Sequence, residues 1–416
     1  MDGEIWQELY RNVLPPKLNN TLVGFNANLD RVITVTSEII QSPTFRLAEL
    51  SELKTRLLYS MQHCRAEEWY VTDDLQYNVF TNLFSDTGTL AIGGQAGIAA
   101  VYLASIGIPK VVCVAPSIGM DIAKILKKAG VLVVNDNSGS MNRADTTHLV
   151  FEYPPGLVPL AEGAVARNNR FIVSPVHGPE SVLIPENSMD NVLSEISSCN
   201  RAFLSGYQYL QTDEQFALAA DQIQVMKKNN DQMRIHVECV SVNDDAVIGG
   251  FLQYILPVAD SIGLNEHELL LLLHYLEPWN PEYGISAILS PVQLVKGAIE
   301  VCRKRGLKRL HLHAFGYYIL VLRTDRAHPP ASRNALLFAS RATAHAAQGS
   351  CTDISPAGID ALEQVDDTFG PYISPGIFPV DAYTVVIIPT IIAHNIRKSS
   401  GLGDILSSTA FVADQF

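Results

Sequence analysis

Cysteine is scarce in this sequence and widely spaced. The six cysteines form no CxxC pair, and the two closest in sequence, Cys199 and Cys239, are 40 positions apart. That spacing excludes a zinc knuckle built on paired cysteines and a dense disulfide framework. We therefore expect reduced thiols, as is usual in a cytoplasmic protein.

Long hydrophobic runs are also missing. The most apolar stretch, residues 97–115, is interrupted by Ser105, Pro109 and Lys110. Other apolar runs are far shorter than the roughly 18 residues that span a bilayer. The first ten residues, MDGEIWQELY, are acidic and amphipathic, unlike a secretory signal peptide. These features predict a soluble, cytoplasmic protein without a membrane partner.

Charged residues make up only 18% of the chain, whereas about 25% is usual. Acidic side chains (43) outnumber basic ones (30), and the net charge of −13 argues against a nucleic-acid partner. A protein of this charge that binds an anion needs a local device, such as a helix N-terminus, a few arginines or a metal ion. The apolar residues, at 47%, are enough for a large buried core.

Short runs rich in valine and isoleucine alternate with helical patterns along the chain. The runs cover residues 21–25, 110–114, 201–204, 234–240, 309–313 and 384–388, and helical periodicity covers 97–106, 120–129, 213–229 and 291–305. Such runs are typical of strands buried on both faces of a parallel sheet. The alternation predicts an α/β protein with a doubly wound, mainly parallel sheet flanked by helices.

Three segments depart from this alternation, namely residues 32–44, 65–88 and 137–174. They are richer in aromatic residues, threonine and alternating patterns such as HLVFEY. They predict a smaller, discontinuous β-rich domain that is inserted into the main one and acts as a lid over a cleft. The large domain then comprises residues 1–31, 45–64, 89–136 and 175–416.

The strongest chemical signal is the motif KSSGLGD at residues 398–404. It follows the apolar run TVVIIPT and opens an apolar helix. Glycines before a helix let backbone N–H groups converge on an anion, assisted by the helix dipole. Asp404 could take a proton from a hydroxyl there, so the motif suits phosphoryl transfer to an alcohol. Taken alone, the motif is about equally typical of a capped turn.

Two further motifs suit the binding of a polyol. Gly94 and Gln95, in GGQAG, offer a backbone N–H and a side-chain amide, although close helix packing is a common alternative reason for such glycines. The motif is neither a dinucleotide fingerprint nor a Walker loop. Asn28 and Asp30 share one face of an extended segment after the first strand, where ligands of open α/β sheets bind. An Asx-rich turn is the simpler explanation.

Two acidic motifs end predicted strands, namely His236-Val-Glu238 and Asn265-Glu-His-Glu268. Carboxylates in such positions can hold Mg2+ directly or through its waters. A zinc site that also uses His311 and His313 is the rival interpretation, but no HExxH or Cys/His set supports it. These two histidines are better explained as a packed histidine and a residue of the site wall.

In this order, the pieces NANLD, GGQAGIAA, NNRFIVSP, FLSGYQYL, IHVE, GLNEHE, VVIIPT and GLGD resemble the ADP-dependent sugar kinases of the ribokinase-like superfamily. That family comprises ADP-dependent glucokinases and phosphofructokinases. The resemblance covers nearly the whole chain, and the set of pieces is specific where each piece alone is not. It implies a ribokinase-like fold, ADP as the phosphoryl donor, Mg2+ as the cofactor and a lid that closes over the sugar. We expect a monomer or a small homo-oligomer.

The resemblance also implies roles for individual residues. For the chemical step, Asp404 matches the catalytic base, Arg170 an arginine that contacts the transferring phosphate, and Gly401, Leu402 and Gly403 the anion hole. The sugar contacts are matched by Asn28, Asp30, Gly94 and Gln95. The surroundings of the magnesium ion are matched by Glu238, Glu268 and Asp404, and the nucleotide contacts by His313, Val386 and Gly403.

Two positions bear on the sugar acceptor. Glu68, in RAEEWYV, and His148, in THLVFEYPPG, resemble residues of the glucokinase type, whereas the phosphofructokinase type has a small residue and an asparagine there. The phosphofructokinase type also has basic residues just after the second of these strands, where this chain has Pro154 and Pro155. Phosphate recognition depends on arginine and lysine, so a sugar phosphate would be poorly held without such residues. The resemblance therefore implies an unphosphorylated hexose, glucose, bound by Glu68 and His148.

Two departures from the family pattern fall in the expected nucleotide half. Ile391 stands where an arginine is frequent, and Ala314 follows His313 where a threonine is usual. These departures bear on the identity and affinity of the nucleotide donor more than on the phosphoryl transfer itself. The alternatives to a glucokinase are a phosphofructokinase, an enzyme that uses both sugars, and a catalytically weak sugar or nucleotide sensor.

Overall fold

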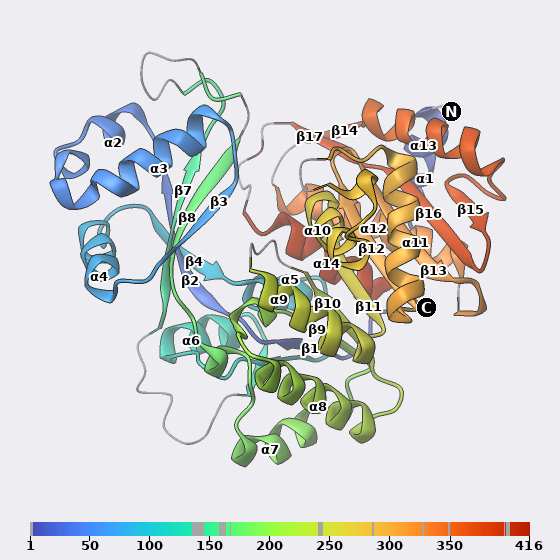
Figure 1. The fold of residues 1–416 in the computed structure, drawn as a ribbon, viewed down its shortest axis with the longest axis horizontal. Coiled ribbons are helices and arrows are strands. Elements are labelled where there is room, and N and C mark those ends of the chain that lie inside the picture. The colour runs from blue at the N-terminus through green and yellow to red at the C-terminus, as the bar shows by residue number, and fades with distance from the viewer. Residues whose placement is uncertain are drawn as a thin grey trace.

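The computed structural model describes residues 3–134, 145–157, 164–166, 168–239, 244–284, 287–326, 328–347, 350–394, 396 and 400–416. Within these residues the chain forms a large sheet, a smaller sheet and a two-stranded ribbon, connected mainly by helices (Figure 1). The smaller sheet and its helices lie on the left in Figure 1, and the chain passes between the two sheets several times.

The large sheet has ten strands in the order β15-β16-β13-β12-β11-β10-β9-β1-β5-β6. These strands are β1 (Thr21–Gly24), β5 (Val111–Val114), β6 (Leu132–Val134), β9 (Arg201–Leu204), β10 (Arg234–Glu238), β11 (Ser261–Asn265), β12 (Arg309–Ala314), β13 (Tyr317–Arg323), β15 (Ile377–Val380) and β16 (Tyr383–Pro389). The strands from β12 to β6 pair in parallel, as predicted. The predicted run at 384–388 is also a strand, β16, but it pairs antiparallel with both neighbours. Its burial therefore reflects the helices on its two faces and not parallel pairing.

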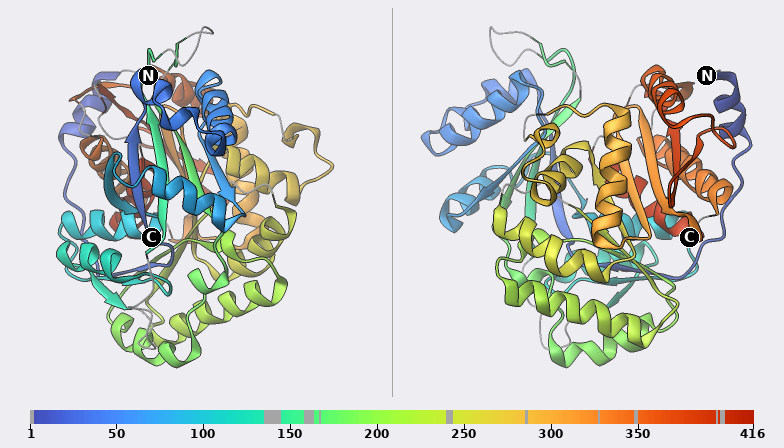
Figure 2. Two further views of the ribbon diagram at one scale, coloured as in Figure 1. Left: turned by 90° about the vertical axis from the view of Figure 1, so that its left-hand side faces the viewer. Right: turned by 45° about the vertical axis from the view of Figure 1, so that its right-hand side comes forward.

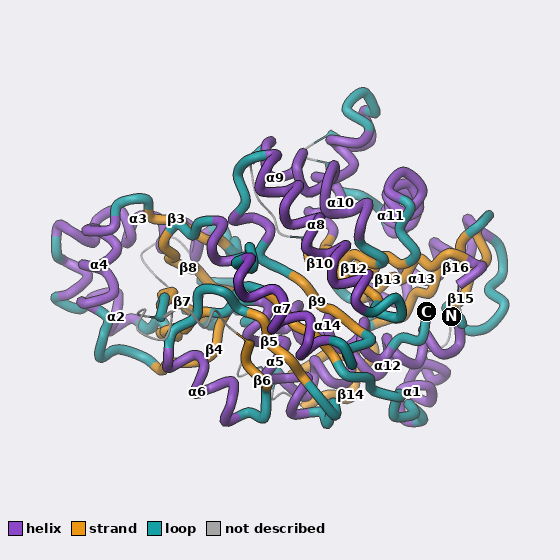
Figure 3. The backbone as a smooth tube through the Cα atoms, turned by 90° about the horizontal axis from the view of Figure 1, so that it is seen from below, coloured by secondary structure: helices purple, strands orange, loops and turns teal. Residues whose placement is uncertain are grey.

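Helices cover both faces of the large sheet (Figure 3). On one face α5 (Gln95–Ser105), α12 (Pro329–Ala346) and α14 (Leu402–Ala413) pack against one another. On the other face lie α8 (Asp213–Asn229), α9 (Asp245–Gly250), α10 (Glu266–Leu276), α11 (Pro291–Arg305) and α13 (Pro356–Phe369). The predicted helices at 213–229 and 291–305 are confirmed as α8 and α11, and each opens with a capping box that fixes where it starts.

The remaining helices and strands lie at the edges of the large sheet or on the smaller one. They are α1 (Gly3–Arg11), α2 (Ser37–Gln41), α3 (Ser51–Gln62), α4 (Asp74–Leu83), α6 (Met120–Lys128) and α7 (Glu186–Ile196), with the ribbon strands β14 (Ser350–Ile354) and β17 (Ile391–His394). No helix in the described part of the chain is both long and apolar enough to cross a membrane.

The smaller sheet has the strand order β3-β8-β7-β2-β4. Its strands are β2 (Asn28–Thr34), β3 (Glu67–Val71), β4 (Thr89–Gly93), β7 (Thr147–Tyr153) and β8 (Asn169–Pro175). Because side chains alternate between the two faces of a strand, the odd-numbered Ile33, Phe151 and Phe171 share one face. They are fully buried in a cluster with α3 and α4, which lie on the side away from the large sheet (Figure 2). The even-numbered side chains of β2, β3, β7 and β8 lie on the opposite face of the small sheet, together with the odd-numbered positions of β4.

The extent of this smaller unit differs from the prediction. Leu53 and Leu57 of α3 pack in the same apolar cluster as the small sheet, and β4 is an edge strand of that sheet. Residues 51–62 and 89–93 therefore lie with the small sheet, although the sequence pattern assigned them to the large domain. The apolar face of a helix does not show in the sequence which sheet it covers. The predicted boundary at residues 136–137 falls outside the described residues.

Candidate active site

Helix α14 begins beside a cavity that lies between the two sheets. Gly401 precedes the helix with a φ of +73°, a conformation that favours glycine. A Cβ at this position would lie 2.7 Å from Cδ1 of Ile98 on α5. Glycine thus lets α14 begin close to α5, which puts Asp404 in the first turn at the cavity. Of the KSSGLGD motif, Lys398 and Ser399 lie outside the described residues.

The start of α5 and the strand β2 form a second wall of the cavity. Gly94 has a φ of +73°, and a Cβ there would lie 2.8 Å from Oδ1 of Asn28. Asn28 Nδ2 donates a hydrogen bond to Asp30 Oδ1 over 2.7 Å. Burial raises the pKa of Asp30 to about 7, although the bond from Asn28 acts in the opposite direction. A carboxyl group with this pKa is only partly ionised at neutral pH.

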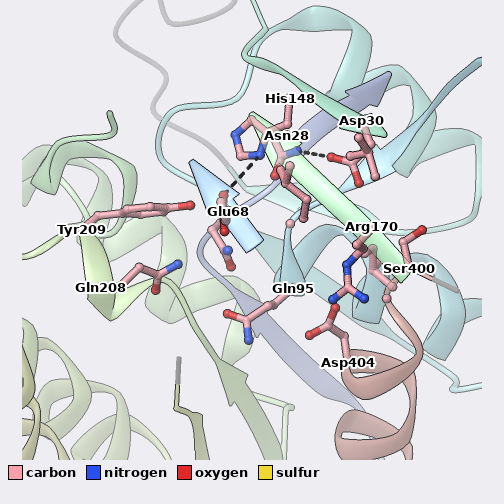
Figure 4. Close-up of a pocket in the computed structure, with 16 residues that line it drawn as sticks. Asn28, Asp30, Glu68, Gln95, His148, Arg170, Gln208, Tyr209, Ser400 and Asp404 are labelled. Carbon is pink, nitrogen blue, oxygen red and sulfur yellow. Dashed lines mark hydrogen bonds and ion pairs between the residues drawn. The ribbon is translucent and has the colours of Figure 1, made fainter. Parts of the chain in front are cut away.

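The cavity has a volume of about 220 Å³ (Figure 4). Nine residues that were predicted for the active site line it: Asn28, Asp30, Glu68, Gly94, Gln95, His148, Arg170, Gly401 and Asp404. They come from strands β2, β3, β7 and β8 of the small sheet and from the starts of α5 and α14. The structure therefore brings the predicted sugar contacts together with Arg170, Gly401 and Asp404, whereas Leu402 and Gly403 of the predicted anion hole are not part of the lining.

Charge is distributed unevenly around the cavity. Among the described residues that line it, Arg170 is the one side chain with a fixed positive charge, and three are acidic: Asp30, Glu68 and Asp404. In Figure 4 the guanidinium of Arg170 points toward the carboxylate of Asp404. The cavity can thus hold one anionic group near Arg170 and the start of α14, while its other walls suit hydroxyl groups.

Glu68 and His148 form the part of the cavity that lies on the small sheet. The Glu68 side chain is 31% exposed, and Ser174 Oγ donates to its Oε1 over 2.5 Å. His148 Nδ1 lies 4.0 Å from the same oxygen. Burial raises the pKa of Glu68, whereas the bond from Ser174 lowers it. Burial also lowers the pKa of His148 to about 3, so His148 is a neutral imidazole at physiological pH.

Glu238, a predicted magnesium residue, lies outside the lining of this cavity. It ends β10 and is 4% exposed, and its Oε1 interacts with His236 Nε2 at 2.6 Å and accepts a hydrogen bond from Ser407 Oγ. Gly263 on β11 makes room for this group, since a Cβ there would lie 2.2 Å from Glu238 Oε1. Burial raises the pKa of Glu238 to about 8. A buried acid of this kind gains from a nearby cation, which would favour its ionised form.

Glu268, the second predicted magnesium residue, also has a local structural role. It forms a capping box at the start of α10, in which Glu268 Oε2 accepts from the N–H of Asn265 and Asn265 Oδ1 accepts from the N–H of Glu268, both over 2.9 Å. No three His, Cys, Asp or Glu side chains gather around one point in the described part of the chain. Mg2+ commonly uses one or two carboxylates together with nucleotide phosphates, so binding of this ion does not require a closed cage of protein ligands.

The predicted nucleotide residues fall into two groups. Nε2 of His313 would lie 3.6 Å from a Cβ on Gly403, so these two residues meet at the first turn of α14, which also contains Leu402. Burial lowers the pKa of His313 to about 4. Val386, in contrast, has no exposed surface and lies in the middle of β16. The structure does not support Val386 as a nucleotide contact, because its side chain belongs to the core.

Four polar or aromatic residues of the cavity were not predicted, namely Asn26, Gln208, Tyr209 and Ser400. Three of them lie in the pieces NANLD and FLSGYQYL, directly after strands β1 and β9. Ligands of open α/β sheets bind beyond the carboxyl ends of strands. That rule, applied to every predicted strand, would have found these residues.

Comparisons with known proteins find relatives along nearly the whole chain. A family model described as the ADP-specific phosphofructokinase/glucokinase conserved region matches residues 19–413. An ADP-dependent glucose/glucosamine kinase of Pyrococcus furiosus is 26% identical, over 98% of both chains. An ADP-specific phosphofructokinase of Methanosarcina acetivorans is 24% identical, over 99% of this chain and 98% of its own. The solved structure of an ADP-dependent kinase with fructose 6-phosphate and ADPβS has a TM-score of 0.82 at 24% identity, over 99% of this chain and 98% of its own.

The fold and the cavity, together with these matches, define an ADP-dependent sugar kinase. More narrowly, the chain belongs to the family of ADP-specific phosphofructokinases and glucokinases, whose conserved region covers nearly all of it.

Proposed function

We propose that this protein transfers the β-phosphoryl group of ADP to the 6-hydroxyl of glucose and releases glucose 6-phosphate and AMP. The observation that carries the choice of glucose is the charge of the cavity lining. Asp30, Glu68 and Asp404 supply three carboxyl groups, and Arg170 supplies one fixed positive charge. If Arg170 contacts the transferring phosphate, no second cationic side chain among the described lining residues is left for a phosphate on the sugar.

Glu68 is the main determinant in this proposal. A carboxylate can accept hydrogen bonds from two hydroxyl groups of a neutral sugar. The same carboxylate repels a phosphate group on the substrate, so it selects against fructose 6-phosphate as well as for glucose. The Pyrococcus furiosus relative, named for glucose and glucosamine, supports this assignment.

Asp404 is the proposed general base. It lies in the first turn of α14 and beside the cavity, where a carboxylate can take the proton of an attacking hydroxyl. The first backbone N–H groups of a helix have no partner within the helix, so those at the start of α14 can bind the oxygens of the transferring phosphoryl group. Arg170 adds a fixed charge on the opposite side, and catalysis then depends mainly on positioning and charge.

The proposed cofactor is Mg2+, bound with the nucleotide. It would supply charge neutralisation for the phosphates of the donor. Glu238 and Glu268 would orient the metal and its waters from their buried positions. Ser407 and His236 hold Glu238 in place for this purpose.

The competing function is that of a phosphofructokinase, which the Methanosarcina acetivorans relative favours by its name. Initial rates of AMP formation from ADP, Mg2+ and either glucose or fructose 6-phosphate decide between the two. We expect a higher kcat/KM for glucose in the wild type. Glu68→Ala should lower the value for glucose about 10–100-fold, since charge-assisted hydrogen bonding worth ~1.5–3 kcal/mol in total is lost.

Glu67→Ala is the matched control, because Glu67 precedes Glu68 on β3 and its side chain points to the other face of the strand. A wild type that prefers fructose 6-phosphate, with a preference that Glu68→Ala leaves unchanged, would establish the phosphofructokinase. Binding of sugar and ADP without release of AMP would establish a sensor.

A further inference from the structure

Four side chains form a continuous hydrogen-bonded chain that ends at Glu68. His177 Nε2 lies 3.0 Å from His148 Nε2, His148 Nδ1 lies 3.1 Å from Ser174 Oγ, and Ser174 Oγ lies 2.5 Å from Glu68 Oε1. His177 was not among the predicted site residues. It follows β8, in the loop that leads back to the large sheet.

The positions of the protons follow from the chemistry of the four groups. Ser174 donates to the Glu68 carboxylate, so its oxygen must accept from Nδ1–H of His148. A neutral imidazole has one N–H, and His148 Nε2 is then an acceptor. His177 must therefore donate its Nε2–H to His148. Each bond in the chain points toward Glu68.

His177 also connects the two sheets. Its ring packs on Tyr209, with ring centroids 4.6 Å apart, and Tyr209 follows β9 of the large sheet and lines the cavity. His148, Ser174 and Glu68 lie on the small sheet. The ring of His177 is thus held from the large-sheet side while its Nε2 contacts the small sheet.

We propose that His177 is a positioning residue for sugar recognition, which fixes His148 in the Nδ1–H tautomer and so keeps the Ser174 hydroxyl directed at Glu68. This inference deepens the proposed function and rests on Glu68 as the sugar-binding carboxylate. Because both ring nitrogens of His148 are used within the chain, His148 also acts through Glu68.

Loss of the His177 donor has a definite consequence. Without it, His148 can adopt the Nε2–H tautomer, in which Nδ1 accepts the proton of Ser174. Glu68 then loses a hydrogen bond to its ionised form, and its pKa rises. The other titratable groups that face Glu68 are Tyr70 on β3, Arg170 on β8, Asp30 on β2, His148 on β7 and Tyr209 after β9. Among these groups, His148 changes its tautomer when His177 no longer donates, and an aromatic ring at position 177 keeps the packing on Tyr209.

The test uses three substitutions in the full-length enzyme. His177→Phe keeps a ring that can pack on Tyr209 but cannot donate, and His177→Gln restores a donor. His63→Phe is the matched control, since His63 also packs on a tyrosine, Tyr59, with ring centroids 4.1 Å apart, and is exposed on the far side of the small sheet. Measurements are kcat and KM for the preferred sugar between pH 5 and 8, in wild-type and Glu68→Ala backgrounds.

We expect His177→Phe to raise KM for the sugar about threefold to tenfold, the worth of one hydrogen bond, with kcat within about twofold. The acidic limb of the kcat/KM profile should move to higher pH in His177→Phe. In His177→Gln, KM and the pH profile should stay close to those of the wild type. In the Glu68→Ala background His177→Phe should have no further effect, because the effects of substitutions at coupled residues are not additive. Unshifted pH profiles, or additive effects in the double variant, would overturn the proposal.

Long-range 1H–15N spectra of the histidine rings separate this proposal from the proposed function, because they need no sugar. They should show His148 protonated at Nδ1 in the wild type and partly at Nε2 in His177→Phe. If the enzyme prefers fructose 6-phosphate but the tautomer and the coupling change as expected, the choice of glucose fails and the role of His177 stands. A His148 tautomer that is the same in both proteins refutes the role of His177, whichever sugar is used.

Discussion

Ser407 donates a hydrogen bond to Glu238 and lies three positions after Asp404 on α14. One helix therefore presents the proposed base at the cavity and holds the proposed magnesium carboxylate one turn further on. Glu238 comes from β10, on the large sheet. A buried contact between two side chains thus fixes the position of α14 relative to the end of β10.

Asp404→Asn should lower kcat by about 10²–10⁴-fold, the usual contribution of a general base, and should leave glucose affinity within a few fold. The amide has the same shape but cannot accept the proton. Steady-state kinetics and titration calorimetry measure the two effects separately. Asp360→Asn, at an exposed position on α13, is the control. Retention of more than about a tenth of kcat, a difference of only ~1.4 kcal/mol, would exclude Asp404 as the base.

Glu268→Gln should raise the Mg2+ concentration that gives half-maximal rate about 10–100-fold, the usual effect of losing a group that orients a metal ligand. The thermal stability of the Glu268→Gln protein should change little, because glutamine also completes a capping box. Rates measured across a Mg2+ titration, together with a melting curve, check both statements. A variant that loses stability but keeps its Mg2+ dependence would leave Glu268 as a helix cap alone.

The raised pKa of Glu238 predicts that the stability of the protein depends on pH. Burial raises its pKa from 4.5 to about 8, so between these values the folded protein binds the proton more tightly than the unfolded chain. The contribution of this group to the free energy of unfolding therefore falls as pH rises through that window. Urea unfolding at pH 5, 6, 7 and 8 should show a smaller loss for Glu238→Gln than for the wild type. Parallel losses in the two proteins would show that Glu238 does not titrate in this range.

Gly401→Ala should impair both stability and activity. Its positive φ alone costs about 1–2 kcal/mol for a residue with a Cβ, and that Cβ would also meet Ile98 on α5. Gly306→Ala is the control for strain alone, since Gly306 has a φ of +69° at the end of α11 and open space around its Cβ position. We expect the loss of kcat/KM to be confined to Gly401→Ala. Equal activity in the two variants would contradict a role for the start of α14 in phosphate binding.

Local signals predicted several elements closely. The ends of α8 and α11 follow from capping residues and periodicity within the same segment, namely Thr212 with Gln215 and Ser290 with Gln293. Gly401 and Gly94 were identified from their place just before a helix, and both have the positive φ that favours glycine. In each case the physical cause lies within a few residues, so the sequence contains it.

The pairing of strands and the packing of α3 depend on contacts between residues far apart in the chain. The run at 384–388 predicted a strand but not its antiparallel partners, because an apolar run shows burial and not direction. Val386 matched a family position, yet only its place between two helix layers shows that its side chain cannot reach a ligand.

The amino-acid sequence by itself determined the chemistry of the site, since it identified the carboxylates, the arginine and the glycines that now line one cavity. Only the tertiary structure decided how they act on one another. The chain from His177 to Glu68 joins residues 68, 148, 174 and 177 across three strands and a loop, and Ser407 reaches Glu238 across 169 positions. Hydrogen bonds between distant side chains need angstrom-level placement, which arises from the packing of whole sheets and helices and leaves no local pattern in the sequence.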